Sequence, residues 1–196
     1  MAPTGFETLC LGLTGFFYRD HFLGEAAAGL VLHEANSMVA EGQLRQAGVG
    51  RDAKLAPATR GDDFCWVEPS EVGPGIAALM DRFEAIRLVL NQDAYLGLAR
   101  YEMQLACYAP GSAGYSRHFD AFKGGASNRR LTAIYYLNPL WESDHGGRLG
   151  LFLPGGQIDV DPLHDRLLIF LADEVEHAVL PVHAHRLALT AWFYGS

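Results

Sequence analysis

The class of fold follows from one short stretch, Leu131-Thr132-Ala133-Ile134-Tyr135-Tyr136-Leu137, in which two sets of side chains alternate. In an extended chain, successive side chains point to opposite faces. Thr132, Ile134 and Tyr136 therefore share one face of a predicted strand, and the residues between them share the other. The same period of two begins at Tyr101, which indicates a strand-rich C-terminal half.

Further strands are expected on the C-terminal side of this stretch, at residues 148–153, 157–160, 166–171, 175–180 and 186–194. Turn-forming pairs separate them, among them Asn138-Pro139, Gly146-Gly147 and Asp161-Pro162. Many short strands at this spacing are typical of a sandwich or a barrel.

Two helices are expected before these strands. Residues 24–42 are rich in alanine, and Leu30, His33, Glu34 and Met38 recur there at helical spacing. Residues 76–90 carry an apolar stripe that predicts core packing, formed by Ile76, Leu79, Met80, Phe83, Ile86 and Leu90. Helices followed by strands predict an α+β, mainly β fold, in which N-terminal helices support a barrel-like core.

The composition fits an ordinary soluble globule. The chain has 196 residues, of which 49% are hydrophobic and 19% are charged, and this length suits a single domain. The net charge of −8 disfavours nucleic acid as a partner. No stretch is long enough to span a membrane, and the start lacks the basic flank of a signal peptide.

The three cysteines, Cys10, Cys65 and Cys107, are far apart and form no CxxC pair. A disulfide framework and a structural zinc site are therefore not expected. A reducing compartment fits best, which predicts a cytoplasmic protein, with the nucleus as a second location.

A candidate metal site is formed by His118, Asp120 and His177. Two histidines and one carboxylate are the ligands that hold non-haem Fe(II) and leave coordination positions open for oxygen chemistry. On an extended strand, residues 118 and 120 would point the same way. His177 can join them only if the chain folds back, which a barrel achieves.

Arg186 opens the last predicted strand, in which Arg186, Ala188, Thr190 and Trp192 share a face. A buried arginine is costly unless it has a partner. A guanidinium binds a carboxylate through two parallel hydrogen bonds, so this residue predicts a dicarboxylate cosubstrate beside the metal. Each of these residues, taken alone, is more often structural, and it is their joint order in a strand-rich half that favours a site.

In these residues the chain resembles the 2-oxoglutarate- and Fe(II)-dependent dioxygenases, and among them the prolyl 4-hydroxylases of the oxygen-sensing type. The resemblance runs from about Phe17 to Tyr194. The blocks that carry it include Asp20-His21-Phe22-Leu23-Gly24, Thr59-Arg60-Gly61-Asp62, Gly114-Tyr115-Ser116-Arg117-His118-Phe119-Asp120, Ile134-Tyr135-Tyr136-Leu137-Asn138, Gly146-Gly147 and Ala191-Trp192-Phe193.

The resemblance implies a double-stranded β-helix (jelly roll) with supporting helices, in one catalytic domain over residues 1–196. Residues 1–100 would give helical support and a mobile loop at about Gly48 to Asp63, and residues 101–196 the core. Fe(II) would be held by His118, Asp120 and His177. The implied cosubstrate-binding residues are Arg186, Tyr136, Tyr108 and Thr132. The implied substrate-binding residues are Tyr115, Trp192, Arg129 and Asp62, the last two as a charged pair.

The implied reaction is hydroxylation of a prolyl residue at its 4-position in a target protein, with 2-oxoglutarate, O2 and ascorbate, and a role in oxygen sensing. The expected substrate is a proline-containing transcription factor, ubiquitin-ligase adaptor or translation factor. The enzyme is expected to be a monomer. Two departures from the family are expected to matter: Gln104 stands where the animal enzymes carry methionine, which implies a more polar cosubstrate pocket, and no zinc-finger module is expected before the domain. Two other functions stay open, an oxygenase acting on a free amino acid or small molecule, and a metal-binding jelly roll without turnover.

Overall fold

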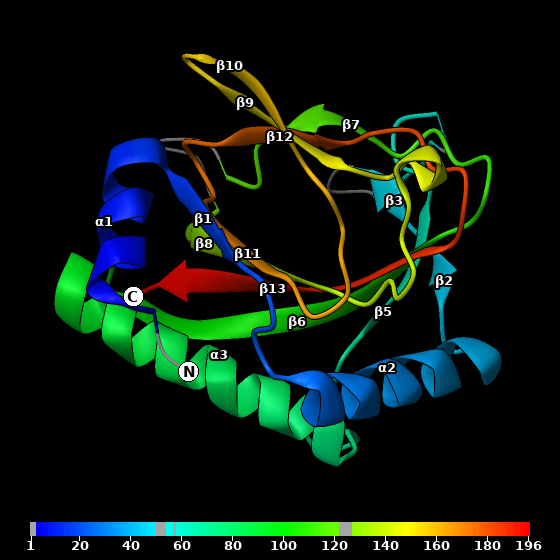
Figure 1. Ribbon diagram of the computed structural model, residues 1–196, viewed down its shortest axis with the longest axis horizontal. Coiled ribbons are helices and arrows are strands. Elements are labelled where there is room, and N and C mark those ends of the chain that lie inside the picture. The colour runs from blue at the N-terminus through cyan, green and yellow to red at the C-terminus, as the bar shows by residue number, and fades with distance from the viewer. Residues whose placement is uncertain (1–2, 50–53, 57, 122–126) are drawn as a thin grey trace.

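The computed structural model describes residues 3–49, 54–56, 58–121 and 127–196, which form two facing β-sheets with helices on one side (Figure 1). The larger sheet has seven strands, in the order β1 (Phe16–Arg19), β11 (Leu167–Leu171), β8 (Arg129–Tyr136), β13 (Arg186–Gly195), β6 (Leu98–Tyr108), β5 (Asp62–Trp66) and β2 (Arg45–Gln46). The smaller sheet has four, in the order β10 (Gly156–Val160), β9 (Leu149–Leu153), β12 (Glu176–Val179) and β7 (Tyr115–His118).

Every pairing between the described strands is antiparallel, and strands distant in sequence are neighbours in both sheets. This arrangement is the predicted jelly roll, and the predicted strands from 148 to 194 are confirmed within a residue or two. A two-stranded sheet pairs β3 (Gly48–Val49) with β4 (Lys54–Leu55), and a short 3-10 helix, η1, spans Ser143–His145.

The two faces of β8 enter different cores, as the alternation predicts. Leu131, Ala133 and Tyr135 pack in a cluster with the helices, whereas Ile134 and Tyr136 pack between the two sheets. Strand β13 lies between β8 and β6, and its side chains also alternate between the two sides of the sheet. The inward faces of these central strands therefore line the space between the sheets.

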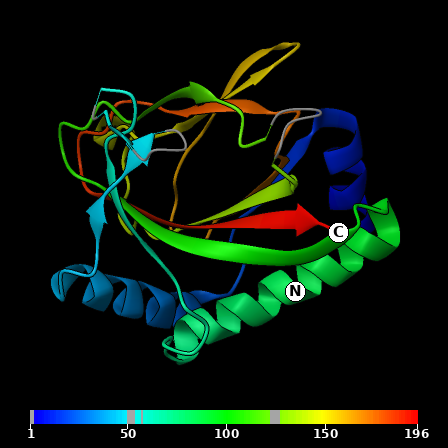
Figure 2. The ribbon, with the colours of Figure 1, turned by 180° about the vertical axis from the view of Figure 1, so that it is seen from behind.

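Three helices support the larger sheet: α1 (Gly5–Thr14), α2 (Glu25–Ala40) and α3 (Pro74–Ala94). Figure 2 shows α2 and α3 beneath β6 and β13. The stripe predicted for α3 is confirmed, because all its members except the half-buried Met80 are fully buried. The helix predicted over residues 24–42 is confirmed as α2, which turns Ala28, Val31 and Ala35 inward and leaves Leu30 49% exposed.

Both of these helices begin without a local side-chain cap and receive one from a distant residue. Glu34, in α2, accepts hydrogen bonds from the backbone N–H groups of Gly75 (2.6 Å) and Ile76 (2.9 Å) at the start of α3. Asp165 does the same for Leu23 (2.8 Å) and Gly24 (2.9 Å), just before α2. Carboxylates at these positions satisfy unpaired N–H groups and suit the helix dipole, so they fix the helices to each other and to the sheet.

The loop predicted to be mobile, Gly48 to Asp63, includes residues 50–53 and 57, which lie outside the described residues; its described parts contain β3, β4 and the start of β5. None of the described helices is both long enough and apolar enough to cross a membrane.

Candidate metal centre

The two predicted histidine ligands are cross-strand neighbours. His118 ends β7 and His177 lies in β12, and these strands pair so that the two residues face each other. Their ring centroids are 4.3 Å apart. The two histidines, 59 positions apart in sequence, are thus brought together by one antiparallel ladder, as the predicted fold requires.

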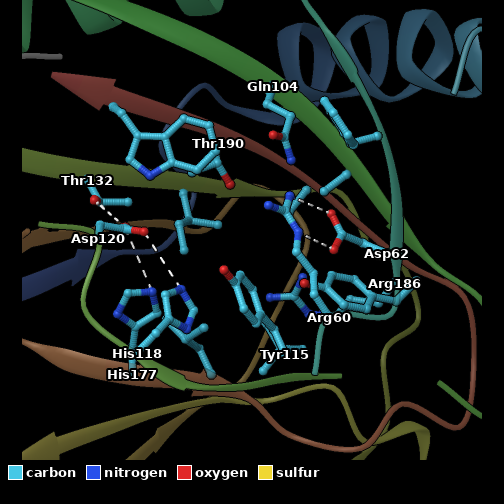
Figure 3. A pocket seen from close by; sticks show the side chains of 18 of the residues that line it. Arg60, Asp62, Gln104, Tyr115, His118, Asp120, Thr132, His177, Arg186 and Thr190 are labelled. Carbon is cyan, nitrogen blue, oxygen red and sulfur yellow. Dashed lines mark hydrogen bonds and ion pairs between the residues drawn. The ribbon is translucent and has the colours of Figure 1, made fainter. Parts of the chain in front are cut away.

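Asp120 completes the set from beyond the end of the strand. The chain is extended only to His118, so the predicted continuation of the strand through Asp120 is wrong. The carboxylate nevertheless reaches both rings, with Oδ1 3.7 Å from His118 Nε2 and Oδ2 3.8 Å from His177 Nε2 (Figure 3). One ligand atom from each of the three residues lies within 4.8 Å of the others, a spacing that one metal ion can bridge.

Hydrogen bonds orient all three side chains. Nδ1 of His118 lies 2.8 Å from the Ser116 carbonyl oxygen, and Nδ1 of His177 lies 3.2 Å from that of Val175. A carbonyl oxygen only accepts, so each Nδ1 carries the proton and each Nε2 keeps its lone pair for a metal. The Thr132 hydroxyl donates to Asp120 Oδ2 at 2.6 Å and fixes the carboxylate.

The electrostatics favour the metal-binding protonation states of His118 and Asp120. Burial, followed by repulsion from His177, lowers the pKa of His118 to about 4. Burial acts to raise the pKa of Asp120, but attraction to the two imidazoles and the hydrogen bond from Thr132 hold it below the usual carboxyl value. A neutral imidazole beside a carboxylate at neutral pH is the form that binds Fe(II).

Arg186 lies deep in the same space, only 4% exposed, at the start of β13. Its Nε donates to the Gly147 carbonyl at 2.7 Å, and no carboxylate pairs with its guanidinium among the described residues. A Cβ on Gly147 would lie 2.8 Å from Arg186 Cδ, which explains the need for glycine there. A buried cation without a counter-ion is costly, so the position suits an anionic ligand.

Two buried phenols border the guanidinium. The Arg186 Cζ lies 5.2 Å from the ring centroid of Tyr108 and 5.3 Å from that of Tyr136. Burial raises the pKa of both phenols, that of Tyr136 to about 12, so both keep their protons as donors. The Tyr136 hydroxyl is buried and has no hydrogen-bond partner within the described chain. An unpaired buried donor beside a buried cation fits a carboxylate that would accept from both.

All predicted site residues except Tyr136 line one pocket of about 450 Å³ between the sheets. This volume is in the range of small-molecule sites. Metal ligands stand at one end and Arg186 at the other, with Thr132 and Tyr108 between the sheets, so the residues present fit Fe(II) and 2-oxoglutarate.

The predicted substrate-facing residues form a wall near the metal ligands. The Tyr115 ring stacks on His118 with centroids 3.8 Å apart, and Trp192 leaves its buried indole N–H without a partner among the described residues. Arg129 lies over Trp192, with Cζ 4.5 Å from the ring centroid, and donates to the Tyr194 hydroxyl. These contacts give the pocket an aromatic and partly cationic rim.

The predicted pair between Asp62 and Arg129 is wrong for this structure. Asp62 is 1% exposed and accepts from Arg60 Nε at 2.8 Å and Nη2 at 3.0 Å, as Figure 3 shows. Arg60 is nearer in the chain and lies over the Tyr115 ring, 5.1 Å from its centroid. Sequence reasoning missed Arg60 as a pocket residue, although residues two apart on an extended chain share a face and the Arg-Gly-Asp triplet gave the signal.

Gln104 lies inside the pocket, 4% exposed, as the alternation of β6 predicts. It pairs in register with Thr190 on β13, and Figure 3 shows both side chains on the pocket side. Polar groups therefore line the wall opposite the metal ligands.

Comparison with known proteins gives similarity over nearly the whole chain. Residues 103–194 match the model of the 2OG-Fe(II) oxygenase superfamily. The human prolyl hydroxylase EGLN3 is 36% identical over 95% of this chain and 81% of its own length. A Pseudomonas putida prolyl-4-hydroxylase structure has a TM-score of 0.89 and 33% identity, with 98% of each chain covered.

A prolyl hydroxylase structure from Trichoplax adhaerens, in complex with a hypoxia inducible factor oxygen degradation domain peptide fragment, also has a TM-score of 0.89. Its sequence is 30% identical, and the match covers 96% of this chain and 87% of that one.

Proposed function

The chain belongs to the prolyl hydroxylases of the 2OG-Fe(II) oxygenase superfamily, and from this premise we propose that it hydroxylates a prolyl residue, at the 4-position, within a target polypeptide. The reaction uses Fe(II), 2-oxoglutarate and O2, with ascorbate keeping the iron reduced. Fe(II) and 2-oxoglutarate, when bound, supply the oxygen chemistry that yields succinate, carbon dioxide and a hydroxylated carbon.

One observation carries the proposal: two pre-oriented histidines and a carboxylate share a buried pocket with a cation that has no carboxylate partner among the described residues. In this proposal His118, Asp120 and His177 hold the iron. Arg186 binds the far carboxylate of 2-oxoglutarate, assisted by the hydroxyl of Tyr136 and bordered by Tyr108 and Thr132.

The remaining predicted residues receive the substrate. Tyr115 and Trp192 would hold the proline ring next to the metal, and Arg129 would donate to the polypeptide at the rim. Asp62 would act through Arg60, which it orients over Tyr115. Because His177, Arg186 and Thr132 are buried in the inner part of the pocket, the reacting carbon would meet the metal in a space that the bound substrate shields from water.

The substrate itself is proposed only as a class. Relatives of this chain include one solved with a hypoxia inducible factor peptide, which favours a polypeptide over a free amino acid. A proline-containing transcription factor, ubiquitin-ligase adaptor or translation factor meets this description, and regulation by oxygen would follow from its hydroxylation.

We further propose that residues 1–196 act as one monomeric catalytic domain, because a single chain provides every residue of the site and one apolar cluster joins the helices to the sheet. The free, half-buried thiols of Cys10, Cys65 and Cys107 favour a reducing compartment, the cytoplasm or the nucleus.

The test is an assay of the purified protein with Fe(II), ascorbate, 2-oxoglutarate and proline-containing peptides, including the hypoxia inducible factor fragment. Succinate release and a peptidyl proline that gains one oxygen atom are expected. Hydroxylation of free proline alone would instead support a small-molecule oxygenase. Binding of metal with no succinate from any substrate would support a jelly roll without turnover.

A further inference from the structure

A second groove, of about 440 Å³, opens where β5 leaves the edge of β6. Its lining consists of Trp66, Val67, Glu68, Pro69, Met80, Tyr101, Glu102 and Met103. Trp66 also lines the metal pocket, so one indole forms part of both walls. Its ring centroid lies 5.9 Å from that of Trp192, beside the metal ligands. The groove is therefore continuous with the rim of the metal pocket.

A chain of hydrogen bonds also connects the rim of the metal pocket to the groove. Arg129, on the rim of the metal pocket, donates to the Tyr194 hydroxyl at 3.2 Å. That hydroxyl donates to Glu102 at 2.9 Å, and Glu102 lines the groove.

The backbone of β6 is an open edge at the groove. Strand β5 pairs with β6 only from Gln104 to Tyr108, and the last bond between them runs from the Val67 N–H to the Met103 carbonyl, at 2.9 Å. From Leu98 to Met103, β6 pairs in register with β13 alone among the described strands. Backbone groups alternate in direction along a strand, so those of Tyr101 face the same side as the Met103 carbonyl. An open edge of this kind can receive an extended segment.

The side chains of the groove define what it would receive. Val67 and Met103 are buried and form an apolar floor, while Trp66 is 40% exposed. The charged residues in the lining are both acidic. Glu102 is already paired with Arg100 at 2.5 Å, whereas Glu68 is exposed and has no ion-pair partner in the described part of the chain. An extended segment with apolar side chains and one basic residue matches these features.

We propose that this groove binds one flank of the polypeptide substrate as a strand added to the edge of β6, with a basic side chain of that flank beside Glu68. The inference rests on the proposed function and adds to it a specificity determinant outside the metal pocket. Backbone hydrogen bonds to β6 would give affinity, and Glu68 would give selectivity for charge.

The first test uses peptide libraries with a central proline and either lysine or glutamate fixed at each flanking position in turn, with kcat/KM read from hydroxyproline by mass spectrometry. The wild-type enzyme should prefer lysine over glutamate by about threefold to fivefold at one or two positions on one flank, the size of an exposed charge pair. The variant Glu68→Lys should reverse this preference through KM, with kcat unchanged.

The matched control is Asp93→Lys, which makes the same change of charge at an exposed position near the far end of α3. It should leave the preference of the wild type intact. A uniform change in both variants would mean that only net charge matters, and this would overturn the role of Glu68.

The second test probes the backbone bonds with peptides that carry a single N-methyl group at each position in turn. Methylation should raise KM by about threefold to tenfold at alternate positions of the same flank, because every second N–H faces β6. Equal effects at successive positions, or none on either flank, would rule out strand addition. If the wild type hydroxylates no peptide at all, the proposed function itself fails and this inference fails with it.

Discussion

The seven-stranded sheet separates two interiors of different character. Between the sheet and the helices, side chains such as Phe83, Leu189 and Phe193 form an apolar cluster, and the buried Asp165 beside it is fully used as an acceptor for the Tyr135 hydroxyl and for backbone N–H groups before α2. Between the two sheets, an apolar cluster fills only part of the space, and the rest is a pocket with buried His177, Arg186 and Thr132. The same strands, β6, β8 and β13, provide a wall to both.

The difference shows that one side of the sheet mainly stabilises the fold, while the other provides the groups for ligand binding. Apolar burial stabilises the folded chain in proportion to area, whereas a buried cation or an unpaired buried hydroxyl destabilises it until a ligand binds. Arg186 and the Tyr136 hydroxyl are such groups. The helix side of the sheet therefore offsets the cost of a pocket that is complete only with its ligands.

The largest effect is expected from removing a metal ligand. His177→Ala should reduce succinate formation by more than about a hundredfold, since even groups that merely orient ligands contribute tenfold to a hundredfold. The thermal unfolding temperature of the metal-free protein should change little, because His177 lines the pocket between the sheets and does not pack in the apolar cluster with the helices. Binding of Fe(II), measured by titration, should fall together with activity. Full activity in this variant would refute the assignment of the metal site.

The opposite result is expected from the helix side. Phe193→Ala removes a fully buried ring that packs against Phe83 and Tyr101, and should lower the free energy of unfolding by about 3–5 kcal/mol. The apparent KM for 2-oxoglutarate, measured well below the unfolding transition, should not change. A large change in that KM while the variant is fully folded would show that packing on the helix side of the sheet does affect cosubstrate binding.

Much of this division could be predicted from local sequence. The alternation in 131–137 and 186–194 gave both faces of β8 and β13, because the period of two belongs to the extended backbone itself. The stripe on α3 was equally readable, since almost every member is buried by one surface. The residue types and order of His118, Asp120, His177 and Arg186 are distinctive enough to predict a common site, and these residues line one pocket.

What could not be predicted depends on contacts between distant residues. The helical spacing of Leu30 and Glu34 predicts the helix but not which of its faces is buried. Leu30 is exposed because a close approach between α2 and the start of α3 at Gly75 sets which face turns inward. Glu34 caps the start of α3. Asp62 pairs with Arg60 and not with Arg129. The two-residue spacing makes this pair possible, but which arginine lies within reach depends on how the chain before β5 approaches Tyr115.

A smaller effect than loss of a metal ligand is expected at the other end of the pocket. Arg186→Ala should raise the apparent KM for 2-oxoglutarate by at least about thirtyfold, because the ligand carboxylate would lose its charged partner in a buried place, at a cost of about 2–5 kcal/mol. Arg186→Lys is the matched variant, which keeps the charge but loses the planar fork, and should be intermediate.

Arg186→Ala also tests whether the pocket between the sheets lowers the stability of the ligand-free protein. Removing an unpaired buried cation should leave the ligand-free protein as stable as before, or more stable. Thermal unfolding with and without 2-oxoglutarate would measure this. An unchanged KM for 2-oxoglutarate would contradict the proposed role of Arg186.

The smallest effect is expected at Thr132. It lies in β8, which borders both interiors, but its side chain points only into the pocket between the sheets. Thr132→Val keeps the shape and the β-branched character of the side chain, so β8 should remain intact. It removes the hydroxyl that donates to Asp120 Oδ2 at 2.6 Å, and outer groups of this kind typically contribute tenfold to a hundredfold to metal affinity or activity. Fe(II) affinity should therefore fall by about tenfold, while KM for 2-oxoglutarate at saturating iron changes less.

Thr132→Ser, which restores the donor, is the control and should recover most of the affinity. If KM for 2-oxoglutarate rises instead while iron affinity is unchanged, Thr132 contacts the cosubstrate directly and does not act by orienting Asp120.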